Sequence, residues 1–284
     1  MSDGNLPAAQ KRKLRLKRPQ HLPNISINQM IPNMLTILSL CAGLSAIRYA
    51  TLERWEHAVI AMMASAILDA LDGRIARLLK GTSQFGAELD SLADLVAFGV
   101  APALVLYMWA LNDAGPLGWV ACLAFCCCSA LRLARFNVAL AETDKPPFAG
   151  QYFTGVPTPA GAGLAILPLT LSLAMSENNL GNLRDMDPIL VPWLLFVGAL
   201  MISWVPTFSF KKVRVPRAYA AFVLLGIGAF AALLINTPWL TVSCLLLCYL
   251  ATLPLAVRRY NQQWAVWKAN TDTPPPTVDA PSAS

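Results

Sequence analysis

The chain has 284 residues, of which 56% are hydrophobic and 13% are charged, and its formal net charge is +6. The charges gather in short stretches between long apolar runs, a pattern that argues against a soluble globular domain and is typical of an integral membrane protein. The basic clusters flank apolar runs without interleaved aromatic residues, so they favour anionic lipids over nucleic acid as partners.

The N-terminal segment is basic and polar. Residues 1–20 are predicted to form a disordered tail, and they lack the apolar core and small-residue cleavage site of a removable signal peptide. Residues 22–30 alternate polar and apolar side chains, which predicts a short amphipathic helix at the membrane interface before Pro32.

Eight apolar runs follow, each long enough to cross a bilayer core, which needs about 20 residues per helix. The predicted fold is therefore all-α, a polytopic bundle of about eight transmembrane helices forming one membrane domain over residues 21–260. Residues 261–284, rich in Pro, Ser and Thr towards their end, are predicted to be a disordered C-terminal tail. The expected spans are 33–50, 56–80, 87–111, 117–137, 158–176, 188–207, 219–236 and 239–257.

The distribution of basic residues predicts the orientation. Eight spans place both termini on one side, and of the Lys and Arg residues only Arg48, Arg54 and Arg184 fall on the opposite side. Because loops rich in Lys and Arg stay in the cytoplasm, both termini are expected to be cytoplasmic. The chain is thus predicted to be a multi-pass protein of the inner (plasma) membrane.

Four aspartates interrupt the second and third spans, where a charged side chain costs several kcal/mol. Asp69 and Asp72 are three residues apart, and Asp90 and Asp94 are four apart, so each pair projects from one helix face. Four converging carboxylates repel one another unless cations neutralise them. Oxygen-only ligands without nearby His or Cys favour two Mg²⁺ or Mn²⁺ ions, as used in phosphoryl transfer.

The surrounding residues suit a phosphate-containing ligand. Gly73, Gly86 and the small Ala76 permit close approach to the backbone, and positive charge for phosphate oxygens comes from Arg74, Arg77 and Lys80. The alternative is that the acids only form ion pairs with Arg74, Arg77 and Lys80 at the membrane boundary. A purely structural network does not require the flanking small residues, which favours the ligand site.

The run from Asp69 to Asp94 resembles the signature of the CDP-alcohol phosphatidyltransferase family, DxxDGxxARx₈GxxxDxxxD, at every fixed position. The resemblance implies that Asp69, Asp72 and Asp90 bind the metal ions and that Asp94 is the general base and also touches one ion. It also implies that Asp69 and Gly73, Ala76, Arg77 and Gly86 line the CDP pocket. Homodimers are common in this family, so a homodimer is expected.

Further motifs resemble the phosphatidylserine synthase branch of that family. They are Pro32-Asn33 with Thr36, the run Ser129–Asn137, Gly155–Pro159 and Pro206–Lys212, although Val156 and Thr158 stand where Leu and Ser are expected. This resemblance implies transfer of the phosphatidyl group of CDP-diacylglycerol to L-serine, with an active site at the cytoplasmic face.

The acceptor or lipid phosphate is expected to bind basic and amide groups at cytoplasmic span ends. The candidates are Arg132, Arg135, Asn137, Lys211 and Lys212. The alternative is that the two arginines and the two lysines only anchor the span ends at the membrane face.

Two alternatives remain open. One is the same chemistry with another acceptor, such as glycerol 3-phosphate, inositol phosphate or choline. The other is an ion-coupled or proton-coupled transporter, since acids inside a membrane often mark ion routes. A transporter predicts acids at mid-membrane and inverted repeats, neither of which the sequence displays.

Overall fold

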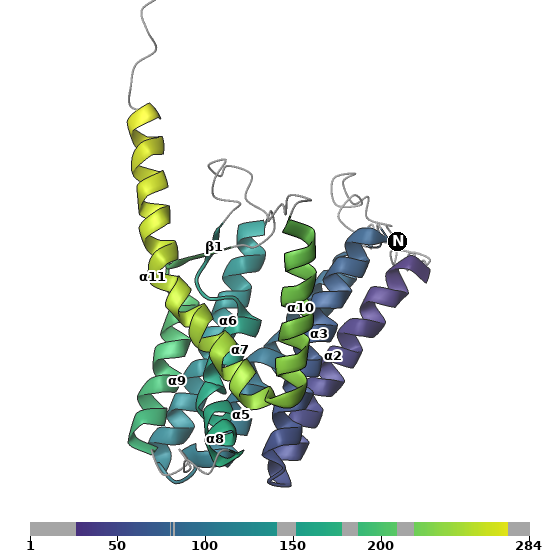
Figure 1. The fold of residues 1–284 in the computed structure, drawn as a ribbon, viewed down its shortest axis with the longest axis vertical. Helices are drawn as coiled ribbons and strands as arrows, with labels where there is room; N and C mark the ends of the chain where they lie inside the picture. The colour runs from purple at the N-terminus through teal and green to yellow at the C-terminus, as the bar shows by residue number, and fades with distance from the viewer. Residues whose placement is uncertain are drawn as a thin grey trace, which may run out of the picture.

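The computed structural model describes residues 27–79, 81, 83–140, 152–177, 187–208 and 219–271. Within these ranges the chain is a bundle of helices, as predicted, with one short ribbon of two strands at one end (Figure 1). The first helices in chain order are α2 (Ile27–Thr51), α3 (Trp55–Leu78) and α4 (Gln84–Asp94). They are followed by η1 (Leu95–Val100), α5 (Ala101–Leu106), η2 (Tyr107–Leu111) and α6 (Pro116–Leu140). The remaining helices are α7 (Thr158–Ala165), α8 (Leu167–Glu177), α9 (Asp187–Ile202), α10 (Ala220–Asn236) and α11 (Pro238–Thr271).

Each predicted span coincides with a helix or with a chain of helices. Among the described residues, four helical stretches are individually long and apolar enough to cross a membrane, and the bent pair α7–α8 makes a fifth when counted as one span. The helix α3 carries Asp and Arg residues, whereas α9 and α10 are short. The protein therefore has several helices that are able to span a membrane, as a membrane protein requires, and the number of eight remains a prediction.

The third predicted span contains two π-helical turns. α4, η1, α5 and η2 run on without a break over Gln84–Leu111, and the π turns flank α5, which carries Pro102 in its first turn. Proline lacks a backbone N–H, and widening of the preceding turn is one way in which a helix accommodates it. The first π turn begins directly after Asp94, so the helix geometry changes at the edge of the acidic motif.

The helices α2 and α3 pack closely as an antiparallel pair. Ser39 Oγ and Ser65 Oγ each donate to the other residue's backbone carbonyl at 2.9 Å. Farther along α2, a Cβ on Gly43 would lie 2.8 Å from Ala97 Cα, so this glycine allows α2 to approach η1. Contacts with both neighbours bring the first turns of α2 beside the acid-bearing ends of α3 and α4.

The ribbon was not predicted by the all-α fold class. Strands β1 (Tyr152–Thr154) and β2 (Pro206–Phe208) pair antiparallel, with Phe153 opposite Thr207. Gly155 follows β1 with a φ of 77°, and a Cβ there would lie 2.4 Å from the Met201 carbonyl oxygen. Only glycine fits this position, which explains the start of the Gly-Val-Pro-Thr-Pro run.

Two predicted boundaries differ from the structure. Residues 27–30 form the first turn of α2, which continues through Pro32 as one helix, while 22–26 lie outside the described residues. At the other end α11 continues to Thr271, so residues 261–271 are helical although they were assigned to the disordered tail. The two tails themselves, residues 1–20 and 272–284, lie outside the described part of the chain.

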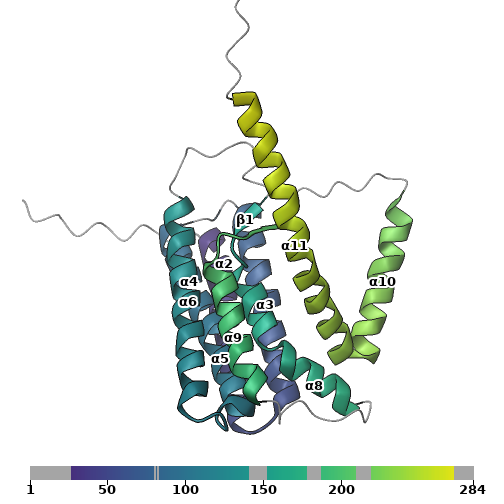
Figure 2. The same cartoon turned by 90° about the vertical axis from the view of Figure 1, so that its left-hand side faces the viewer.

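The segments around the acidic motif gather at one end of the bundle. The start of α2, the turn between α3 and α4, the end of α6 and the ribbon all lie together at one end (Figure 1). The helix α10 packs against α11 and stands apart from the rest of the bundle (Figure 2). The acidic motif therefore lies at the end where the predicted cytoplasmic segments meet.

Candidate active site

The turn between α3 and α4 places the two halves of the acidic motif side by side. The Gly81 N–H donates to the Ala76 carbonyl at 3.0 Å, which closes the end of α3. Ser83 then caps α4, because its Oγ accepts a 3.0 Å bond from the Gly86 N–H. This tight connection brings the last turns of α3 next to the first turns of α4.

Three of the predicted carboxylates converge. One carboxylate oxygen from each of Asp69, Asp72 and Asp90 lies within 4.8 Å of the other two. Asp72 is 5% exposed, whereas Asp69 and Asp90 are half-buried. Buried carboxylates at this separation need a cation, and oxygen donors suit a divalent metal ion, so the residues present fit such a group.

Asp94 lies at the edge of this cluster. Its carboxyl group is in hydrogen-bonding contact with that of Asp69, one helical turn beyond Asp90 on α4. It does not belong to the set of three oxygens that lie within 4.8 Å of one another. Asp94 is therefore adjacent to the three-acid cluster but is not one of its members.

The ion-pair alternative receives no support from the described residues. Arg74 and Arg77 both have exposed side chains, and neither forms an ion pair with one of the aspartates among the residues that the structure describes. Lys80 lies outside those residues. The acidic cluster is therefore not balanced by these two arginines.

Thr36 is a site residue whose contact sequence reasoning missed. Its Oγ1 donates to Asp72 Oδ2 at 2.7 Å across the α2–α3 interface, and its side chain is 5% exposed. The same oxygen lies 3.2 Å from the Pro32 carbonyl. The sequence analysis named Thr36 only as part of a family motif. Thr36 and Asp72 are 36 residues apart, and nothing in that spacing indicates that their side chains meet.

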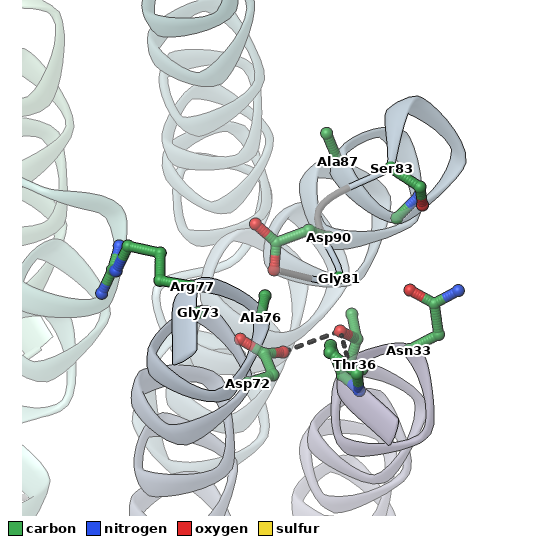
Figure 3. A pocket seen from close by; sticks show the side chains of 12 residues that line it. Asn33, Thr36, Asp72, Gly73, Ala76, Arg77, Gly81, Ser83, Ala87 and Asp90 are labelled. Carbon is green, nitrogen blue, oxygen red and sulfur yellow. Dashed lines mark hydrogen bonds between the residues drawn. The ribbon is translucent and has the colours of Figure 1, made fainter. Parts of the chain in front are cut away.

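A cavity of about 340 Å³ opens beside the acids (Figure 3). Asp72 and Asp90 line it together with the predicted CDP-binding residues Gly73, Ala76, Arg77 and Gly86, whereas Asp69 does not. The first turns of α2 contribute the opposite wall, and the complete lining also includes Pro32, Asn33, Thr36, Gly81, Ser83 and Ala87. The cavity thus combines an acidic side, an arginine and a stretch of small residues.

The two motif glycines have different structural roles. A Cβ on Gly73 would meet no atom within 4 Å, so this position faces open space in the cavity. A Cβ on Gly86 would lie 2.8 Å from Asn33 Oδ1 and 3.1 Å from Ser83 Oγ. Gly73 therefore keeps room for a ligand, while Gly86 lets α4 pack against α2.

The predicted acceptor residues at the end of α6 lie in three different environments. Arg132 is 8% exposed and its Nη1 donates to Thr158 Oγ1. Arg135 donates to the carbonyls of Ile202 and Ser203 at the end of α9, at 2.7 and 3.2 Å, and its guanidinium stacks on Trp204. The Asn137 side chain is exposed and donates to Ser91 Oγ at 3.0 Å.

These contacts distinguish the three residues. Arg132 is the one that also interacts electrostatically with Asp94, whereas Arg135 joins α6 to the segment before the ribbon. A role in acceptor binding remains a prediction for all three. Lys211 and Lys212 lie outside the described residues, so their predicted role is also a prediction.

Comparison with known proteins identifies the family. The family model of CDP-alcohol phosphatidyltransferase matches residues 29–205, which include the whole acidic motif. The chain is 41% identical over 236 residues to a CDP-diacylglycerol–serine O-phosphatidyltransferase of Mycobacterium leprae, covering 83% of this chain and 76% of the relative. It is 39% identical to the protein of the same name from Mycobacterium tuberculosis H37Rv, with 83% and 80% covered.

A more distant relative agrees with these two. A CDP-diacylglycerol–serine O-phosphatidyltransferase of Helicobacter pylori 26695 is 38% identical over 186 residues, which cover 65% of this chain and 74% of the relative. The acidic cluster, the cavity beside it and these similarities agree with one another, and the chain belongs to the CDP-alcohol phosphatidyltransferase family.

Proposed function

We propose that this protein transfers the phosphatidyl group of CDP-diacylglycerol to L-serine, producing phosphatidylserine and CMP. The observation that carries the proposal is the aspartate cluster beside a cavity, in a chain that shares about 40% identity with relatives named for this reaction. The serine acceptor rests on those relatives and on the resemblance of the secondary motifs.

The nucleotide half of the donor fits the cavity between α2, α3 and α4. Gly73 and Ala76 leave space along one wall, and Arg77 supplies a guanidinium that can pair with phosphate oxygens. The acids face the same cavity through Asp72 and Asp90. A pyrophosphate between the arginine and an ion held by the acids would have its charge balanced from both sides.

The acids would hold the divalent cations on which the family generally depends. Asp69, Asp72 and Asp90 provide the oxygen donors, with Asp94 touching one ion, and we propose Mg²⁺ or Mn²⁺ as the physiological ion. When bound, two such ions supply electrostatic stabilisation of the charge that develops on the phosphoryl oxygens and on the leaving group.

Asp94 is positioned to act as the general base. The oxygen of the serine hydroxyl attacks the β-phosphorus, the bond from that phosphorus to the oxygen of CMP breaks, and the hydroxyl proton passes to an Asp94 carboxylate oxygen. The protein's own contribution is to orient the hydroxyl and to hold the pyrophosphate still, which is the main source of catalysis expected in phosphoryl transfer.

The acceptor and the lipid phosphate bind at the cytoplasmic ends of the spans in this proposal. The residues concerned are Arg132, Arg135, Asn137, Lys211 and Lys212. The buried Arg132, which interacts electrostatically with Asp94, is the strongest candidate for the serine carboxylate. The contacts of Arg135 with backbone carbonyls also support a positioning role, in which it holds the end of α9 against α6.

The reaction is proposed to take place at the cytoplasmic face of the inner membrane, in a homodimer surrounded by anionic lipids. The acidic motif lies at one end of the bundle. The predicted topology places most of the basic segments on the same side of the membrane, which supports this orientation. The homodimer rests on the family resemblance alone.

The test is CMP release by the detergent-purified protein supplied with CDP-diacylglycerol and Mn²⁺ or Mg²⁺. L-serine, glycerol 3-phosphate, inositol phosphate and choline are compared as acceptors, and EDTA is the control. Release that depends on metal and on L-serine is the expected result. Release with a different acceptor would keep the acidic site and refute the choice of serine, and no release with any acceptor would refute the proposed function and favour a transporter.

A further inference from the structure

Three buried polar atoms lack a hydrogen-bond partner among the described residues. They are Arg132 Nε, Ser129 Oγ and the Tyr249 hydroxyl oxygen, which lies near the Thr207 side chain but forms no hydrogen bond of regular geometry with it. An unpaired buried polar group lowers the stability of the folded protein by roughly 1–3 kcal/mol, so such a group normally binds a ligand or an ordered water molecule. Arg132 and Tyr249 interact electrostatically with each other, so these two groups lie in the same region of the protein.

Arg132 connects this site to the proposed general base. It lies on α6, nine-tenths buried, and the Thr158 hydroxyl occupies its Nη1. Its guanidinium also interacts electrostatically with the Asp94 carboxylate. The guanidinium that carries the unpaired Nε–H therefore interacts electrostatically with Asp94, the residue that is proposed to deprotonate the acceptor.

Tyr249 reaches the site from α11, far from the acidic motif in sequence. Ser243 Oγ, almost two turns earlier on the same helix, donates to Thr170 Oγ1 at 3.0 Å and fixes α11 against α8. Leu253 and Ala256 are buried farther along the same helix. Tyr249 lies beyond residues 29–205, so it is not part of the region that matches the family model.

We infer that Tyr249 and Arg132 together bind an oxyanion of a substrate, the carboxylate of the amino-acid acceptor, and thereby select acceptors that carry a carboxylate. This inference rests on the proposed function. The Arg132 Nε–H and the Tyr249 hydroxyl are both hydrogen-bond donors and the guanidinium is cationic, so an anion with two oxygen acceptors can accept from both. Thr207 Oγ1, the neighbour of the Tyr249 hydroxyl, itself donates to the Gly155 carbonyl at 3.1 Å. A bound carboxylate would place the acceptor's hydroxyl group near Asp94.

The same donor pair could instead receive the phosphate of the lipid donor, because phosphate and carboxylate oxygens accept hydrogen bonds alike. The acceptor is favoured because the unpaired atoms lie on α6 and α11, whereas the cavity proposed for the CDP portion lies between α2, α3 and α4. The two ligands can be distinguished by removing one of the two donors. The KM for the acceptor rises if the donors bind its carboxylate, and the KM for CDP-diacylglycerol rises if they bind the lipid phosphate.

The experiment compares Tyr249→Phe with the parent protein, using L-serine and ethanolamine, which is serine without its carboxylate. The phenylalanine keeps the ring and removes the hydroxyl donor. We expect the KM for L-serine to rise roughly 10-fold or more, as for loss of a hydrogen bond to a charged group. The KM for CDP-diacylglycerol and the rate of CMP release with ethanolamine should stay unchanged, so the preference for serine over ethanolamine falls.

Tyr107→Phe is the matched control. Tyr107 is half-buried in η2, where its ring packs edge-on against Trp119 at 5.2 Å, away from the site. This variant should retain the KM for both acceptors. Arg132→Lys provides a second test, since the lysine keeps the charge but lacks the Nε–H, and it should reduce the preference for serine in the same direction.

Several outcomes would overturn the inference. Equal losses with serine and ethanolamine in Tyr249→Phe would show a structural role, and an unchanged KM for serine would show that the hydroxyl does not bind the acceptor. A rise confined to the KM for CDP-diacylglycerol would assign the pair to the lipid phosphate. Failure of the proposed function is recognised separately, because the parent protein would then release no CMP with L-serine.

Discussion

At the scale of single residues, the acids have different neighbours and so different expected roles. Asp72 is buried, accepts a hydrogen bond from Thr36 and has an oxygen within 4.8 Å of the other two cluster acids, whereas Asp94 lies at the edge of the cluster beside Asp69 and interacts electrostatically with Arg132. A metal-holding acid and a proton-accepting acid should respond differently when the charge is removed without a change in size.

Asp72→Asn is expected to lose metal binding and CMP release together, because an amide cannot replace a carboxylate as a charged ligand. Asp94→Asn should retain CMP binding while its turnover falls by roughly 100-fold or more, as expected when a general base is removed. Mn²⁺ binding followed by electron paramagnetic resonance, together with CMP binding and turnover, separates the two variants. Full activity in either variant would contradict its assignment.

Thr36 is expected to position Asp72. In Thr36→Val the 2.7 Å hydrogen bond disappears while the side-chain shape is kept, so Mn²⁺ affinity should fall by roughly 10-fold, or about 1.4 kcal/mol. Thr36→Ser retains the hydroxyl and is the matched control, with affinity close to that of the parent. If the valine variant binds Mn²⁺ as tightly as the parent, the hydrogen bond does not influence the metal site.

At the scale of secondary-structure elements, the site depends on how closely α2, α3 and α4 approach one another. The polar contacts of Ser39 with Ser65 align α2 with α3, and Gly86 allows α4 to reach Asn33 on α2. The glycines of the motif therefore provide a way to separate packing between helices from space for the ligand.

Alanine at the two motif glycines should have opposite effects. Gly86→Ala places a methyl group 2.8 Å from Asn33 Oδ1, and overpacking of this kind costs about 1–3 kcal/mol, so the thermal midpoint of the purified protein should fall. Gly73→Ala meets no atom, so stability should be unchanged or higher, but CMP should bind less tightly because the methyl group enters the cavity. Thermal unfolding and CMP titration of both variants test this contrast.

At the scale of the whole molecule, the arrangement of helices decides which loops share a side of the membrane. The turn between α3 and α4 lies at the end that carries the site, and the turns at 52–54 and 112–115 lie at the other end (Figures 1 and 2). With the predicted orientation, the first of these turns faces the cytoplasm and the other two face outward.

Cysteine labelling in intact cells tests this topology. In a background without the seven native cysteines, Glu53→Cys and Asn112→Cys should react with a membrane-impermeant maleimide from outside, while Ser83→Cys should react only after the cells are opened. Retained CMP release in each variant confirms that the fold is intact. Reaction of Ser83→Cys from outside would reverse the proposed orientation.

The sequence by itself determined the membrane class, the positions of the apolar helices and the acidic motif, because composition and spacing along one helix are local properties. It also identified Gly73, Ala76, Arg77 and Gly86 as neighbours of the acids, since all four lie within two adjoining helices. The eight expected spans correspond to the helices or helix chains between α2 and α11.

Only the tertiary structure decided which distant residues complete the site. Thr36 reaches Asp72 across an interface, Gly86 is constrained by Asn33, and Arg132 interacts electrostatically with both Asp94 and Tyr249. The bend between α7 and α8, the β1–β2 ribbon and the continuation of α11 to Thr271 also differ from what local patterns predicted. The physical reason is that hydrophobic periodicity reports the environment of a residue along its own helix, whereas these features depend on side chains that other helices bring into contact.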